Sequence, residues 1–171
     1  MLQLAKGNLI DMAEQGLFDV IVHGCNCLNT MGSGIAAEIR SRYPEAYEAD
    51  TAYSLKLQDD TNSQVQKLGN YSAHLVKGEH DFLIVNAYTQ VMFTPRGVDH
   101  FEYASFEVIL KKFAHEYGPF KIGFPYIGMG LAGGDKDRNI AMIEDFAEKI
   151  SATGGSVTLV EFGWHSTKDL L

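Results

Sequence analysis

The stretch from Phe18 to Ala36, FDVIVHGCNCLNTMGSGIA, places a strand, a loop and the start of a helix directly after one another. Phe18 to His23 is almost continuously apolar, which is typical of a strand buried on both faces. Gly24 to Gly34 is rich in glycine, asparagine and cysteine and predicts a loop. Ile35 to Tyr43 then spaces its apolar residues as a helix does. This order is the one in which α/β proteins bind ligands at the carboxyl ends of strands.

A second segment of the same kind lies in the C-terminal half. Lys121 to Ile127 predicts a strand, Gly128 to Gly134 (GMGLAGG) a glycine-rich loop, and Asn139 to Ile150 a helix. Successive backbone N–H groups in such a loop can form a concavity that binds anions, although either loop taken alone is equally compatible with an ordinary turn. Two loops in the same strand-to-helix position predict a diphosphate site held from two sides.

The remaining elements complete an α/β pattern. We expect further strands at Leu2–Ala5, Gly69–Val76, Asp81–Ala87 and Ser156–Phe162. We expect further helices at Pro44–Leu55 and Phe101–Tyr117. The polar stretch from Gln58 to Lys67 is expected to be a surface excursion with no role in the core. Alternating strands and helices favour a mixed or parallel central sheet covered by helices on both faces. At 171 residues, we expect residues 1–171 to form one domain.

Composition and charge narrow the class of partner. The chain is 46% hydrophobic, as folded globular proteins are, and its formal net charge is −8. That charge disfavours non-specific binding to nucleic acid or to an anionic membrane, because both need a field of the opposite sign. No apolar run approaches the roughly 20 residues of a membrane span. Cys25 and Cys27 are too close together for a disulfide framework, so we expect a reduced, cytoplasmic protein.

Several polar and aromatic side chains are candidates for chemistry. Asn26 and Asn29 carry amides suited to sugar hydroxyls. His23 is a candidate general acid or base, and equally a core histidine with its hydrogen bonds satisfied inside the protein. Asp135 is a candidate partner for His23, although an N-cap of the following helix is the more ordinary role for it. Phe162, with Tyr126 and Trp164, would be able to stack on a base or to fill the core.

Two other classes of site fit the sequence less well. Gly32 to Ala37 fits the dinucleotide-binding pattern G-x-G-x-x-A, but about nine residues separate His23 from Gly32, whereas the first glycine of that pattern follows its strand directly. His23, Cys25 and Cys27 resemble metal ligands, yet a structural zinc site uses four, generally in two separated pairs. We therefore expect neither a metal nor a cofactor.

Taken together, Lys6-Gly7-Asn8, VIVHGCN at 20–26, GSGIA at 32–36 and FPYIGMGLAGG at 124–134 resemble a macro domain over nearly the whole chain. The resemblance implies an α/β fold with three layers, α/β/α, and a mixed central sheet. It also implies that ADP-ribose or a derivative, free or on an ADP-ribosylated macromolecule, lies across the strand ends. The residues expected to contact the ligand are Asn8, Leu9, Asn26, Asn29, Met31, Gly32, Ser33, Gly34, Ile35, Gly128, Met129, Gly130, Leu131, Ala132, Gly133, Phe162 and Trp164.

The sequence departs from the usual macro domain pattern in places that affect function. Asn8 stands where most members have an aspartate that accepts a hydrogen bond from the adenine amino group. His23-Gly24-Cys25-Asn26 is similar to the yeast-type ADP-ribose 1″-phosphate phosphatases and their phage relatives. The chain also resembles the branch of terminal ADP-ribose protein glycohydrolase, but the lysine position of that branch falls on Asn86 and its aspartate position on Ala132. The resemblance thus implies hydrolysis of a bond at the terminal ribose, with His23 and Asp135 as catalytic residues, or alternatively a reader module without turnover.

Overall fold

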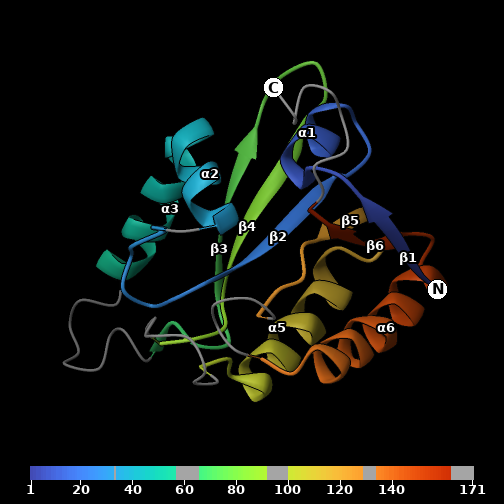
Figure 1. Cartoon of the computed structure of the whole chain (residues 1–171). Helices are drawn as coiled ribbons and strands as arrows, with labels where there is room; N and C mark the ends of the chain where they lie inside the picture. The colour runs from blue at the N-terminus through green and yellow to red at the C-terminus, as the bar shows by residue number, and fades with distance from the viewer. Residues whose placement is uncertain (33, 57–65, 92–99, 129–133, 163–171) are drawn as a thin grey trace.

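The computed structural model describes residues 1–32, 34–56, 66–91, 100–128 and 134–162, and these form a six-stranded sheet between two layers of helices (Figure 1). The strand order is β1-β6-β5-β2-β4-β3, and every neighbouring pair is parallel except β3 and β4. The strands are β1 (Leu2–Lys6), β2 (Val20–Cys25), β3 (Tyr71–Val76), β4 (Phe82–Tyr88), β5 (Lys121–Phe124) and β6 (Ser156–Glu161). The sheet is therefore mixed, as predicted.

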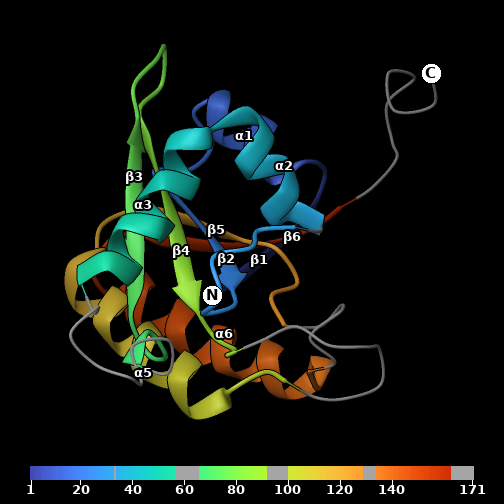
Figure 2. The same cartoon turned by 90° about the vertical axis from the view of Figure 1, so that its left-hand side faces the viewer.

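The helices divide between the two faces of the sheet. They are α1 (Leu9–Glu14), α2 (Gly34–Arg42), α3 (Pro44–Lys56), α5 (Tyr103–Glu116) and α6 (Lys136–Ala152). Figures 1 and 2 show α1, α2 and α3 on one side of the sheet and α5 and α6 on the other. Each side has its own cluster of buried apolar residues. This is the three-layer α/β/α arrangement predicted for the chain.

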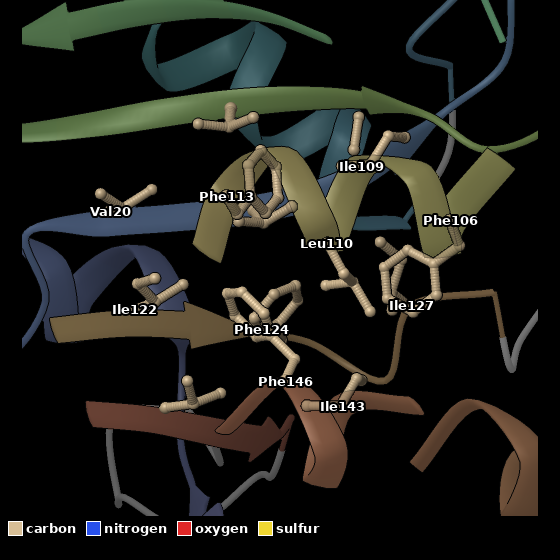
Figure 3. Packing of buried hydrophobic residues seen from close by; sticks show 14 of the residues in the cluster. Val20, Phe106, Ile109, Leu110, Phe113, Ile122, Phe124, Ile127, Ile143 and Phe146 are labelled. Carbon is tan, nitrogen blue, oxygen red and sulfur yellow. The ribbon is translucent and has the colours of Figure 1, made fainter. Parts of the chain in front are cut away.

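The apolar run of β2 is explained by its place in the middle of the sheet. Val20 and Val22 belong to the cluster under α5 and α6, whereas Ile21 belongs to the cluster under α1, α2 and α3. Successive side chains of a strand point to opposite faces, so a strand covered on both faces is apolar throughout. Figure 3 shows Val20 packed among aromatic residues such as Phe113 and Phe124.

The parallel strands bring the ligand loops to one edge of the sheet. β1, β2, β5 and β6 all run in the same direction, so their carboxyl ends lie along the same edge. The segments that follow β1, β2 and β5 lead into α1, α2 and α6, respectively. The two glycine-rich segments identified in the sequence thus begin at this edge.

Three local features test the remaining predictions. β3 and β4 form the expected antiparallel hairpin, in which Val76 pairs with Phe82. The short helix α1 was not predicted. Lys67 was predicted to lie on a surface excursion, and that prediction is wrong: its side chain is 0% exposed because it is paired with buried Asp50. Among the described helices, none is long and apolar enough to cross a bilayer.

Candidate functional site

A cavity of about 420 Å³ opens at the carboxyl edge of the sheet, and we call it the edge cavity. Its wall combines the turn after β1, the first residues of α2, the segment after β5 and the end of β6. The lining residues are Gly7, Asn8, Leu9, Gly34, Ile35, Glu38, Pro125, Tyr126, Val160 and Phe162. Five of the residues predicted to contact a ligand, from three separate segments of the chain, meet here. The volume falls within the range of small-molecule sites.

Sequence reasoning missed part of this wall. Gly7, Glu38, Pro125 and Val160 line the edge cavity but were not among the predicted site residues. Gly7 and Pro125 lie within the motifs that resemble a macro domain, so the sequence indicated that these segments are near the ligand. Glu38 lies one turn after Ile35 on α2. Its position in the sequence does not tell whether such a glutamate lines a cavity or faces solvent.

Asn8 connects the cavity wall to the start of α1. It is the N-cap residue of that helix, and its side-chain Oδ1 accepts hydrogen bonds from the backbone N–H groups of Ile10 and Asp11, both at 3.0 Å. Its Nδ2 donates to Oε1 of Glu38, also at 3.0 Å. The amide therefore satisfies backbone donors that would otherwise lack a partner at the helix start.

Two glycines at this edge depend on having no side chain. Gly34, the first residue of α2, has a φ of 57°, and no atom lies within 4 Å of the position that a Cβ would take. A ligand is thus able to approach its backbone closely. Gly128 has a φ of 74°, and a Cβ there would overlap the buried ring of Phe101. Both positions favour glycine on backbone grounds, and Gly128 also on packing grounds.

The polar side chains of the first loop mainly hold the loop itself. Asn26 accepts a hydrogen bond from the backbone of Leu28 at 2.9 Å and donates one to Oγ1 of Thr30 at 2.7 Å. Asn29 has a φ of 60°, and its Oδ1 accepts from Nζ of Lys67 at 2.6 Å. Met31 also has a positive φ, is buried, and packs in the cluster under α1, α2 and α3, while Gly32 is exposed. The loop that precedes α2 is thus anchored from inside.

His23 lies inside the protein, where its side chain is 1% exposed. Its Nε2 is 2.6 Å from Oδ1 of Asn86, and Nδ2 of that amide donates to the carbonyl of Ala46 and to Oγ of Ser72. Because Oδ1 is then the acceptor, Nε2 of His23 carries the proton. Burial lowers the pKa of His23, so the ring is neutral near pH 7.

Cys25, the last residue of β2, and Cys27, in the loop that follows, are free and buried. Sγ of Cys25 lies 3.6 Å from Nδ1 of His23, and the Cys27 thiol donates to the carbonyl of Gln90 at 3.3 Å. Burial raises the pKa of Cys25, and it raises the pKa of Cys27 to about 12. Both are therefore protonated thiols and poor nucleophiles at neutral pH. Within the described ranges, no three His, Cys, Asp or Glu side chains gather as a metal site would need.

An ion pair is buried beneath the first loop. Nζ of Lys67 donates to Oδ1 of Asp50 at 2.8 Å, and both side chains are at most 1% exposed. The hydroxyl of Tyr88 donates to the same carboxylate oxygen at 2.8 Å, and Ser72 lies 2.6 Å from that hydroxyl. Through Ser72 and Asn86 these contacts continue to His23. We call this chain of contacts, from His23 to Lys67 and on to Asn29, the buried network.

The second loop is described only at its two ends. The N–H of Gly134 donates to the carbonyl of Gly128 at 2.7 Å, which closes the loop at its base. Asp135 is exposed and is the N-cap of α6, where its side chain accepts from the backbone of Arg138. The structure gives Asp135 no contact with buried His23. The predicted site residues Ser33, Met129, Gly130, Leu131, Ala132, Gly133 and Trp164 lie outside the described residues.

Comparisons with known proteins agree with this architecture. No model of a known protein family matches the sequence. Among solved structures, the macrodomain of Mycobacterium tuberculosis DarG superposes with a TM-score of 0.73 at 18% identity, covering 94% of this chain and 97% of that one. Thermosipho africanus DarTG, solved in complex with ADP-ribose, gives 0.67 at 15% identity, covering 96% of this chain and 42% of that one.

The sequence itself has a curated relative. An uncharacterised 17.5 kDa protein from the tk-vs intergenic region of Enterobacteria phage T4 is 32% identical over 151 residues, which are 85% of this chain and 89% of the phage protein. The solved structures share the three-layer fold of this chain, and the phage protein shares its sequence over most of both lengths. The chain therefore belongs to the family of this phage T4 protein, a family with the macrodomain fold.

Proposed function

We propose that this chain binds ADP-ribose or a derivative along the carboxyl edge of its sheet and hydrolyses a bond at the terminal ribose. The observation that carries the proposal is the edge cavity, in which an apolar wall and a few polar groups meet at the strand ends. A protein with the same fold, Thermosipho africanus DarTG, holds ADP-ribose in its solved structure. Together these favour a nucleotide sugar as the ligand.

The proposed ligand has three parts, and the chain offers a place for each. The adenine lies in the edge cavity between Ile35 and Phe162, whose ring is 58% exposed beside it. The diphosphate lies at the N-terminus of α2, where backbone N–H groups and the helix dipole favour an anion. The terminal ribose extends toward Asn26, whose amide retains one N–H beyond the bond to Thr30.

The hydrolytic part of the proposal assigns His23 a positioning role. The prediction from sequence was that His23 assists a water or a leaving group directly, but its ring is buried and its Nε2–H is bonded to Asn86. Through the buried network it acts on the first loop instead, because that network ends at Asn29. A substrate of this class is ADP-ribose 1″-phosphate or an ADP-ribosyl ester.

A reader module without turnover is the second candidate, and one observation favours it. The two residues predicted to be catalytic are both engaged in structural contacts: His23 inside the core and Asp135 at the start of α6. Neither contact requires a reaction. Formation of a product after binding identifies the hydrolase, and binding without a product identifies the reader.

Calorimetric titration with ADP-ribose tests the binding site. Phe162→Ala is expected to weaken the affinity about 5- to 150-fold, because stacking of a base on an aromatic ring contributes about 1–3 kcal/mol. The matched control is Phe120→Ala, which removes an exposed ring, 37% accessible, that lies outside the cavity and is expected to leave affinity unchanged. If the wild-type protein gives no binding heat, or if both variants weaken equally, the proposed site is wrong.

A panel of substrates then tests the reaction. The purified chain is incubated with ADP-ribose 1″-phosphate, ADP-ribosylated protein and O-acetyl-ADP-ribose, and the products are separated by chromatography. Release of ADP-ribose from one of the three identifies a hydrolase and its substrate class. Tight binding of ADP-ribose with all three substrates left intact identifies the reader.

A further inference from the structure

The edge cavity contains a carboxylate that the macrodomain pattern does not assign. We propose that Glu38, held in place by Asn8 and Arg42, is the hydrogen-bond acceptor that selects the 6-amino group of adenine. The proposal rests on the proposed function, since it concerns the base of the nucleotide sugar. Its starting point is the replacement of an aspartate by Asn8, which removes the acceptor expected at that position.

Asn8 does not restore that acceptor with its amide oxygen. Its Oδ1 already accepts two backbone N–H groups, from Ile10 and Asp11, at the start of α1. A carbonyl oxygen has two lone pairs, so both are in use. The amide presents its Nδ2 toward the cavity side, where it donates to Glu38.

Glu38 is fixed by two donors on one oxygen. Its Oε1 accepts from Nδ2 of Asn8 and from Nη1 of Arg42, each at 3.0 Å. Arg42 is in turn held by Asp11, at 2.9 Å from its Nη2, and by Glu14. The Glu38 side chain is 35% exposed and lines the edge cavity. Its other oxygen, Oε2, accepts no hydrogen bond from the residues that the structure describes.

The chemistry of a carboxylate makes this contact selective. An ionised carboxylate only accepts hydrogen bonds, and the 6-amino group of adenine is a donor. Hypoxanthine carries an oxygen at that position, so in the same pose two acceptors would face each other. Hydrogen bonds to charged groups contribute about 1.5–3 kcal/mol, which corresponds to a preference of about 10- to 150-fold.

The experiment compares two nucleotide sugars that differ at this position. Affinities for ADP-ribose and for its hypoxanthine analogue, inosine diphosphate ribose, are measured by calorimetry on wild type and on Glu38→Gln. The wild type is expected to prefer ADP-ribose by at least about 10-fold. An amide both donates and accepts, so Glu38→Gln is expected to lower this ratio to about 3 or less.

Glu45→Gln is the matched control. It removes an exposed carboxylate from the first turn of α3 that does not line the cavity, so it is expected to keep the wild-type ratio. Thermal unfolding of each variant checks that it is folded. An unchanged ratio in Glu38→Gln, an equal loss in Glu45→Gln, or tighter wild-type binding of the hypoxanthine analogue overturns the role of Glu38. If the wild type binds none of these compounds, it is the proposed function that fails.

Discussion

At the scale of single residues, the protonation of His23 makes the stability of the fold depend on pH. Burial lowers the pKa of His23 below its ordinary value of 6.5, whereas in the unfolded chain the ring regains that value. Below about pH 6.5 the unfolded state therefore binds a proton that the folded state does not. The free energy of unfolding consequently falls as the pH drops from 7.5 toward 5, and it is fully recovered above that range.

We expect His23→Gln to have a shallower dependence on pH in this window. Glutamine retains an N–H for Asn86 but has no proton to gain between pH 5 and 8. Urea unfolding at a series of pH values measures the difference, and taking it relative to wild type cancels the titration of the carboxylates that both proteins share. Parallel curves for the two proteins would mean that His23 is as easily protonated in the folded state as in the unfolded one.

At the scale of elements, the start of α1 shows how a six-residue helix is held. Asn8 caps it with two hydrogen bonds and connects it to α2 through Glu38. Asn8→Ala is expected to lower the free energy of unfolding by about 1 kcal/mol, the usual cost of losing an N-cap. Asn8→Ser retains a capping oxygen and loses only the contact with Glu38, so most of the stability should return. Denaturant unfolding of both variants tests this, and equal losses would show that the cap contributes nothing.

The elements that could be predicted are those whose burial determines their pattern. β2 is apolar throughout because it is covered on both faces, and α5 buries Phe106, Ile109, Leu110 and Phe113 at helical spacing. Helix α1 was missed because six residues are too few to establish a periodicity. The same distinction applies to the site. Glycine-rich loops after strands indicated where the cavity lies, whereas Glu38 is one polar residue on a helix, and only the folded chain shows what it faces.

At the scale of the whole molecule, the buried network joins elements that are distant in sequence. It connects β2, β3, β4, α3 and the loop before α2, and its side chains from His23 to Lys67 are almost entirely shielded from solvent. The sequence did not predict it, because Lys67 follows a polar stretch and Asp50 lies in a helix among other charged residues. A polar sequence pattern taken alone predicts that these side chains are exposed. Burial of a charged side chain requires a partner of opposite charge, and only the tertiary structure shows that Lys67 and Asp50 form such a pair.

Replacing one charge of this network should therefore affect the whole fold. Lys67→Met leaves Asp50 buried without a cation, and breaking a buried pair in this way costs about 3–5 kcal/mol. The double variant Lys67→Met with Asp50→Leu removes both charges and is expected to recover at least half of that loss. Recovery will be incomplete, because Asn29 loses its bond to Lys67 in both variants and Tyr88 loses its bond to Asp50 in the double variant.

Urea unfolding measures these stabilities, and titration with ADP-ribose adds a second readout. In the double variant the first loop loses the Lys67 hydrogen bond that holds Asn29 at positive φ. We therefore expect affinity for ADP-ribose to remain below that of wild type even where stability has recovered, because the ordering of the loop must then be completed on binding. A double variant with restored stability and wild-type affinity would show that the network supports the core without positioning the loop. A loss of less than 1 kcal/mol in Lys67→Met would show that the ion pair is not a buried one in solution.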